Sequence, residues 1–148
     1  MSDTDDRKGV REALAKLIRT NANPNKIQDA FAASRTADVG ERGRIVYIGS
    51  AGQGDPHLAQ DVVLRAYLLT INLITRYPAQ QAGWAQQAVD EIIDEMRAEI
   101  DRIVEGNWRA QINWQALTFE GHSRVLDVEI AEKQIKYRLE VIPVQVVP

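Results

Sequence analysis

The sequence has no cysteine, no basic excess and no long apolar run, and each absence excludes a class of protein. Without cysteine there is no disulfide framework, no zinc–thiolate site and no thiol nucleophile. The formal charge of −3 does not favour nucleic-acid binding, which needs a basic surface. No apolar run approaches the roughly 20 residues of a membrane-spanning helix, and the acidic start, Met1–Asp6, lacks the features of a signal peptide. We therefore expect a soluble intracellular protein that does not enter a membrane.

An amphipathic helix is predicted between about Gln80 and Glu105, and the rest of the chain is organised around it. Its apolar residues recur at the i, i+3, i+4, i+7 spacing of one helix face. This face consists of Ala85, Val89, Ile92, Ile93, Met96, Ile100, Ile103 and Val104. The other faces are mainly acidic. We expect the apolar face to pack against a β-sheet.

The length of 148 residues predicts one domain that spans residues 1–148. Residues 1–5 are expected to form a loose tail, followed by an amphipathic helix over residues 6–20. Asn25, with a glutamine three residues later, resembles a capping box. A short second helix is therefore predicted over residues 25–33.

The middle of the chain predicts two strands joined by a polar loop. A β-branched and aromatic run over residues 44–49 is followed by a protruding hairpin loop over 50–60 and a long apolar strand over 62–77. About fifteen extended residues span about 50 Å, whereas a domain of this size has a diameter near about 40 Å. The strand is therefore either bent or projects beyond the domain. We favour projection into a neighbouring chain, which would cover its apolar surface.

The C-terminal third alternates between apolar and polar residues, which predicts strands over residues 114–119, 125–131 and 135–141. Pro143 cannot donate to a strand ladder, so residues 142–147 are expected to be a sheet edge or an arm exchanged between subunits. The predicted fold class is α+β. It combines a mostly antiparallel β-sheet, a long central helix packed against it and an N-terminal helix.

The residues that could carry chemistry do not form a recognisable site. The stretch Gly49–Gly54 follows a strand, but it lacks the Lys-Ser/Thr of a phosphate-binding loop and precedes a second strand rather than a helix. His57 and His122 lie in separate loops, without a carboxylate at ligand spacing. We therefore expect no catalytic residue, no cofactor, no metal and no enzymatic activity.

The acidic residues of the central helix are expected to be a solvated face rather than a catalytic pair, because catalytic carboxylates need a cleft that shifts their pKa values. Two ion pairs at i, i+3 spacing are predicted within this face, Asp94–Arg97 and Glu99–Arg102.

The order of the predicted elements resembles that of the tail terminator proteins of long-tailed bacteriophages. The stretches that carry the resemblance are residues 44–49, residues 64–71 (Leu-Arg-Ala-Tyr-Leu-Leu-Thr-Ile), the helix over 84–104 and the Val-rich end over 137–146. The resemblance is one of pattern and element order, and it covers most of the chain.

The resemblance implies a structural virion protein that forms a ring, typically hexameric, on the finished tail tube. Such a ring stops tube elongation, joins the tail to the head-side connector and lets genomic DNA pass through its lumen without specific binding. It would be assembled in the host cytoplasm and lie at the head-proximal end of the tail. Its partners would be itself, the tail tube protein and the connector or neck protein.

Two segments are the candidate contact sites under this interpretation. Polar loops with glycine hinges often become ordered only on assembly, and an exposed strand edge can add to the sheet of another subunit. The candidate tube or subunit contact loop consists of Gly49, Ser50, Gly52, Gln53, Gly54, Asp55 and His57. The candidate edge-strand contact consists of Ile142, Val144 and Val146. The acidic helix face would either line the channel or face solvent, and we favour solvent.

Three alternatives remain at the level of the sequence. A head-completion or neck adaptor protein would have similar length and composition. A tail-tube-like subunit would polymerise without limit instead of closing into a ring. An intracellular enzyme has little support, because no catalytic constellation is present.

Overall fold

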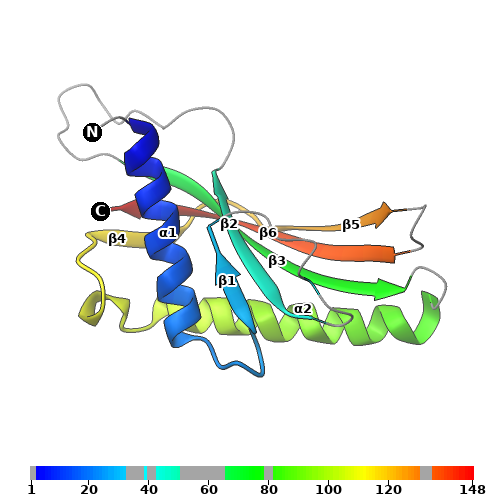
Figure 1. The fold of residues 1–148 in the computed structure, drawn as a ribbon. Helices are drawn as coiled ribbons and strands as arrows, with labels where there is room; N and C mark the ends of the chain where they lie inside the picture. Colours follow the sequence, from blue (N-terminus) through cyan, green and yellow to red (C-terminus); the bar gives the residue numbers. More distant parts are fainter. Residues whose placement is uncertain (1–2, 33–38, 40–42, 51–65, 79–81, 131–134) are drawn as a thin grey trace.

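The computed structural model describes residues 3–32, 39, 43–50, 66–78, 82–130 and 135–148 (Figure 1). The fold is α+β, as predicted, with a curled mixed sheet and two helices. The helical elements are α1 (Asp3–Asn21), α2 (Ala82–Glu105) and a 3-10 turn, η2 (Trp108–Ala110). The strands are β1 (Asp29–Phe31), β2 (Ile45–Ser50), β3 (Tyr67–Pro78), β4 (Ala116–Phe119), β5 (Arg124–Ile130) and β6 (Ile135–Val147).

The strands of the described residues join in the order β1-β2-β3-β6-β4, and β5 pairs with β6 on the same side as β4. Strand β1 runs parallel to β2, and all the other pairs are antiparallel. One edge of the sheet is therefore β1, and the other edge is shared by β4 and β5. The main core lies on one face of the sheet, where α1 and α2 both contribute apolar side chains.

Helix α1 begins earlier than the sequence pattern indicates. It starts at Asp3, so the prediction of a loose tail over residues 1–5 is wrong for residues 3–5. Its predicted apolar face is confirmed, with Leu14 and Ile18 fully buried in the main core. The helix contacts β1 and β2.

The predicted helix over residues 25–33 is wrong, because Asn23 rather than Asn25 organises this segment. The side-chain Oδ1 of Asn23 accepts the Asn25 N–H at 2.9 Å, and its carbonyl oxygen accepts the Lys26 N–H at 2.8 Å. Asx turns of this kind compete with a helix start. The chain then leaves the turn extended, and β1 pairs with β2 around the fully buried Ala30.

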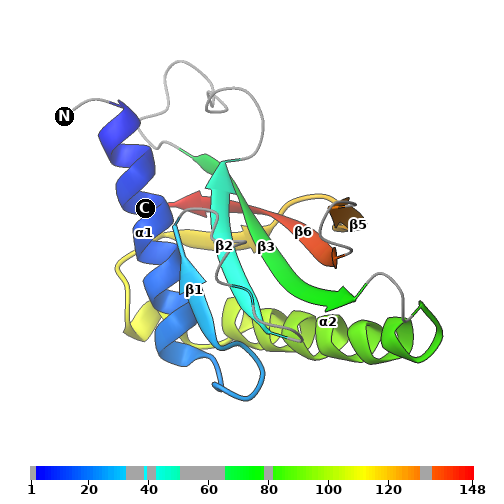
Figure 2. The ribbon, with the colours of Figure 1, turned by 45° about the vertical axis from the view of Figure 1, so that its right-hand side comes forward.

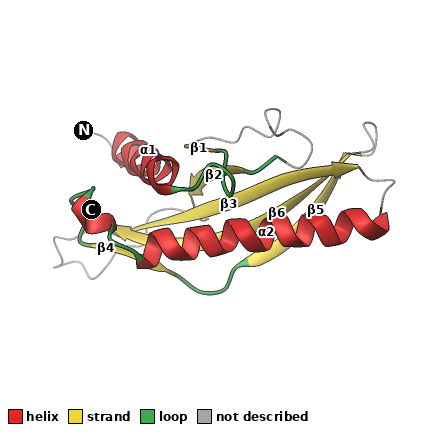
Figure 3. Ribbon diagram, turned by 90° about the horizontal axis from the view of Figure 1, so that it is seen from below, coloured by secondary structure: helices red, strands yellow, loops and turns green. Residues whose placement is uncertain are grey.

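Helix α2 confirms the predicted amphipathic helix. Its buried apolar residues are Val89, Ile92, Ile93, Met96, Ile100, Ile103 and Val104. Gly106 follows the end of the helix, and a larger residue would not fit there, because a Cβ at that position would lie 2.6 Å from the Arg102 carbonyl oxygen. Seen from below, α2 runs along one face of the sheet (Figure 3).

The long apolar segment forms strand β3, which curves within the domain. It spans Tyr67–Pro78, whereas residues 62–65 of the predicted strand lie outside the described residues. It pairs with β6 from Tyr67↔Val146 to Pro78↔Ile135, and Figure 2 shows its curvature. The favoured projection into a neighbour is therefore wrong for the described residues. Apolar residues are buried on both faces, as predicted, among them Ile71 and Ile74.

Pro143 does not end the last strand, contrary to prediction. The carbonyl oxygen of Pro143 accepts the Glu120 N–H at 2.9 Å. In an antiparallel strand the N–H and C=O of one residue point to the same side, so the missing N–H faces this turn and not β3. On this side the partner of β6 changes from β5, whose pairing ends at Val141, to β4, whose pairing begins at Val144. The proline therefore interrupts no bond to β3.

The prediction that Ile142, Val144 and Val146 form an exposed edge-strand contact is also wrong. Ile142, Val144 and Val146 are only 1%, 0% and 0% exposed and belong to the main core. Strand β6 lies between β3 and the β4–β5 pair, so this segment is the interior of the sheet and not an edge.

Candidate functional site

The most distinctive surface of the described chain is the outer edge of β5. Within the described residues, the exposed large apolar side chains are Val125, Leu126 and Val128, at 55%, 39% and 46% exposure. All three are on β5, whose second edge has no strand partner in the described part of the chain. Single exposed apolar residues are ordinary, but three on one unpaired strand form a surface suited to another chain.

The sequence places these side chains on both faces of β5 by simple alternation. The register pairs Leu126 with Leu139 and Val128 with Tyr137 of β6, so these four share the sheet face opposite α2. Val125 points to the α2 side, where it is opposite Glu140. The strand therefore presents a ridge with apolar residues on both sides.

The turn before β5 fixes where the strand starts. Gly121 has a φ of +73°, the left-handed region that favours glycine, and it lies between β4 and β5. The neighbouring Glu120 N–H donates to Pro143, which anchors the turn on β6. Strand β5 then begins at Arg124, three residues after Gly121.

One arginine ties β5 to the rest of the molecule through side-chain contacts. The side chain of Arg138 on β6 is 10% exposed; its Nε donates to Asp127 of β5 at 2.9 Å and its Nη1 contacts Asp90 of α2. The guanidinium also lies over the Tyr77 ring, 5.9 Å from its centre. Burial raises the pKa of the Tyr77 phenol, and the neighbouring Asp127 carboxylate raises it further. This cluster joins β3, β5, β6 and α2.

A second ion cluster joins α2 to β6 and replaces a predicted pair. The sequence pattern predicts a pair with Asp94, whereas Arg97 donates to Asp101 and to Glu140, both at 2.8 Å. It also lies over the Phe119 ring, 5.1 Å from its centre. Glu140 is on the inner side of β6 and only 6% exposed, so this arginine neutralises a buried carboxylate.

The predicted Glu99–Arg102 pair is confirmed, at 2.8 Å. Glu99 is not part of a solvated face, however, because it is 8% exposed and accepts the Asn23 N–H at 2.6 Å. The hydrogen bond from Arg102, supported by that from Asn23, lowers the pKa of Glu99. Its role is to connect α2 with the turn that follows α1.

The structure describes only the start of the predicted contact loop. Gly49 and Ser50 end β2, and the Ser50 hydroxyl accepts a hydrogen bond from Arg11 of α1 at 2.9 Å. The other candidates, Gly52, Gln53, Gly54, Asp55 and His57, lie outside the described residues. Gly49 fits closely against its neighbours, because a Cβ there would lie 3.0 Å from the Thr70 hydroxyl.

Sequence reasoning recognised β5 as a strand but missed its role as the exposed edge. The signal was the combination of apolar residues with Asp127 and Glu129 on the other face, because natural edge strands often carry inward-pointing charges. Alternation alone does not reveal this, since a strand in the middle of a sheet can alternate in the same way.

No cluster that could hold a metal ion is found among the described residues, and His122 is exposed. In the same part of the chain, no helix combines the length and apolar character needed to cross a membrane. A comparison of the sequence with models of known protein families, and with curated proteins, gives no match.

Proposed function

We propose that this chain is a structural virion protein of the tail-terminator type. It forms a ring, hexameric in the simplest case, that caps the tail tube of a long-tailed bacteriophage, stops its elongation and joins it to the head-side connector. The resemblance in element order over residues 44–49, 64–71, 84–104 and 137–146 supplies the phage context. The function is binding alone, and no covalent bond is made or broken.

The observation that carries the proposal is the open apolar edge of β5. A ring subunit needs a surface that another copy covers, and Val125, Leu126 and Val128 supply one at the margin of a sheet whose core is otherwise closed. Strand β5 lies along β6, at the margin of the curled sheet (Figure 1). In this proposal the assembly surface is β5 and not the Ile142–Val146 segment.

The virion setting follows from the same proposal. The ring would be assembled in the host cytoplasm and lie at the head-proximal end of the tail. Its partners are further copies of itself, the tail tube protein and the connector or neck protein, and genomic DNA passes through its lumen without specific contacts. No membrane is involved.

The test combines light scattering with negative-stain imaging of the purified protein. We expect closed rings that bind one end of isolated tail tubes. The double variant Leu126→Lys with Val128→Lys should remain monomeric, because lysine on an edge strand opposes strand addition. Thr118→Lys, on the exposed face of β4, is the matched control and should still form rings.

Three outcomes would contradict the proposal. Open-ended tubes of the purified protein would indicate a tail-tube subunit. A protein that stays monomeric even in the presence of tail tubes would exclude a terminator. Phage that lack the protein but build tails of normal, fixed length would exclude length termination.

A further inference from the structure

The outer face of the sheet, which bears Ile74, Leu139 and Leu126, has an apolar surface of its own. Its buried part is a small cluster that contains no residue of α1 or α2. The cluster consists of Val39, Ile45 and Ile74, with Phe31, Tyr47, Tyr137 and Leu139 partly buried against it. The register extends this surface to the open margin of the sheet, because Ile74 pairs with Leu139 and Leu139 pairs with Leu126.

On β5 and β6 the outer face carries an apolar patch, the outer-face patch, which consists of Leu126, Val128, Tyr137 and Leu139. Leu126 pairs with Leu139 and Val128 pairs with Tyr137, so the four side chains form two neighbouring rows. Leu126 and Val128 are exposed, and Tyr137 and Leu139 are half-buried. An apolar patch that includes an aromatic residue is typical of a surface that binds another molecule.

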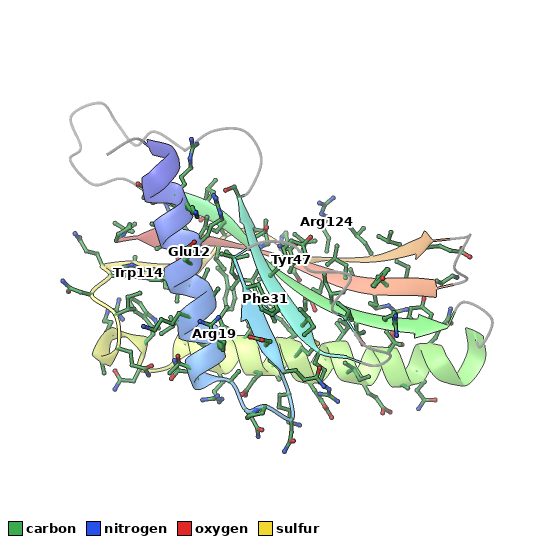
Figure 4. All side chains as sticks on the ribbon, in the orientation of Figure 1. Glu12, Arg19, Phe31, Tyr47, Trp114 and Arg124 are labelled. Carbon is green, nitrogen blue, oxygen red and sulfur yellow. The ribbon has the colours of Figure 1, made fainter. Side chains whose placement is uncertain are left out.

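The charges beside the outer-face patch are basic. Arg76 of β3 pairs with Tyr137, and Arg124 of β5 pairs with Val141, so both arginines are on the outer face. Figure 4 shows the side chain of Arg124 extending away from β5. The carboxylates of β3, β5 and β6 alternate to the helix side of the sheet, and they are Asp127, Glu129 and Glu140. This part of the outer face is therefore positive, although the chain has a net charge of −3.

The two arginines of the outer face differ from those of the helix side in having no carboxylate. Arg97 and Arg138 each bind two carboxylates. Within the described part of the chain, Arg76 and Arg124 form no hydrogen bond or ion pair. A guanidinium can bind a carboxylate through two parallel hydrogen bonds, and arginine and tyrosine are enriched among the residues that dominate binding. The outer-face patch and its arginines are therefore suited to an apolar partner that carries carboxylates.

We infer that the outer-face patch binds an acidic amphipathic helix of another protein, whose carboxylates pair with Arg76 and Arg124. A sheet buries an apolar face by packing it against another element, and a helix with one apolar stripe provides such an element. The two arginines are separated by two strands and, through Tyr137 and Val141, by four residues of β6. These separations place their Cα atoms about 16 Å apart, a distance that about three turns of helix span.

A second copy of this chain does not fit as the occupant. Packing of two outer faces would bring arginines against arginines and leave them without carboxylates. Neither α1 nor α2 has an exposed large apolar side chain among the described residues, so neither helix could cover the patch of another copy. The inference therefore goes beyond the proposed function, and it depends neither on the ring nor on the phage setting.

The test measures the binding of a fluorescently labelled synthetic helix to the full chain by fluorescence anisotropy. This probe has leucines along one side and a glutamate at each end of that side, about eleven positions apart. We expect saturable binding. Replacing both glutamates with lysine should weaken the binding by about tenfold or more, because like charges would then face each other.

Variants of the chain locate the contact. Arg76→Gln should weaken the binding of the glutamate probe about tenfold, because it removes a hydrogen bond between two charged groups. Lys136→Gln is the matched control and should leave the binding unchanged, because Lys136 precedes Tyr137 on β6 and lies on the helix side, opposite Tyr77. In probes with a single glutamate replaced by glutamine, the effect of Arg76→Gln should disappear for one of the two positions and persist for the other.

Circular dichroism and light scattering check that Arg76→Gln folds and assembles as the original protein does, since β6 separates Arg76 from β5. Equal affinity for the glutamate and lysine probes would overturn the inference. So would an unchanged affinity of Arg76→Gln, or tighter binding of a single-stranded oligonucleotide than of the glutamate probe. Rings that do not bind the glutamate probe would overturn this inference alone, whereas a chain that binds the probe but never forms rings would overturn the proposed function alone.

Discussion

At the scale of the residue, substitutions at Ile142 and Leu126 should have different effects on the stability of the fold and on assembly. They are aliphatic residues of equal size on neighbouring strands, but Ile142 is 1% exposed and Leu126 is 39% exposed. Ile142→Ala should lower the free energy of unfolding by about 2–5 kcal/mol, because it leaves a cavity in the core. Leu126→Ala should change it by only about 0.5 kcal/mol, yet weaken ring formation. Urea unfolding of the two variants measures the difference, and equal losses would contradict the placement of β6 inside the sheet.

Glu99 should make the stability of the fold depend on pH. The hydrogen bonds from Arg102 and Asn23 lower the pKa of Glu99 in the folded chain relative to the unfolded chain. The carboxylate therefore stabilises the fold above its unfolded pKa, about 4.3, and this stabilisation is lost as pH falls through the lower folded pKa. Glu99→Gln should be less stable by about 1–3 kcal/mol at neutral pH and lose less stability below about pH 4.3.

The measurement for Glu99 is chemical denaturation at neutral pH and at about pH 3, below the unfolded carboxyl pKa. Glu91→Gln is the matched control, because Glu91 is an exposed glutamate on the same helix. If Glu99→Gln lost as much unfolding free energy on acidification as the original protein does, Glu99 would not be the source of the pH dependence.

At the scale of the element, side chains attach β5 to the sheet through Asp127, which accepts hydrogen bonds from Arg138 of β6 and, at 3.3 Å, from the Tyr77 hydroxyl of β3. All residues of β5 from Arg124 to Glu129 are exposed, so apolar burial contributes little to holding the strand. Arg138→Gln removes the ionic tie to Asp127 and to Asp90. Amide hydrogen exchange in β5 should accelerate about fivefold, the factor that corresponds to about 1 kcal/mol, while exchange in β3 stays slow.

The control for this prediction is Arg97→Gln, which removes a tie between α2 and Glu140 but touches no residue of β5. It should leave exchange in β5 unchanged. Equal acceleration of β3 and β5 in Arg138→Gln would mean that the arginine stabilises the whole sheet rather than this strand.

Elements whose signal is local could be predicted from the sequence. Helix α2 and strands β2 and β5 follow from periodicity and alternation within short windows, and the structure confirms them. Strand β1 could not be predicted, because three residues carry no usable period and its pairing partner is β2. The continuity of β6 through Pro143 depends on a turn near Glu120, and no local pattern contains that information.

At the scale of the whole molecule, the candidate site depends on which strand lies at the edge. Leu126 and Val128 alternate much as Ile142 and Val144 do, and only the order of strands makes the first pair exposed and the second pair buried. Helix α1 and strand β5 lie at opposite ends of the molecule (Figure 1).

The central position of β6 has a consequence for the synthesis of the protein. Strand β6 is the last strand along the sequence, yet it fills the gap between β3 and the β4–β5 pair. Until β6 has emerged from the ribosome, the edge of β3 that faces it has no strand partner, and the apolar face of α2 lacks the side chains that β6 contributes. The sheet is therefore complete only once β6 has been synthesised, so a chain that stops before Ile135 lacks the strand that pairs with the whole length of β3.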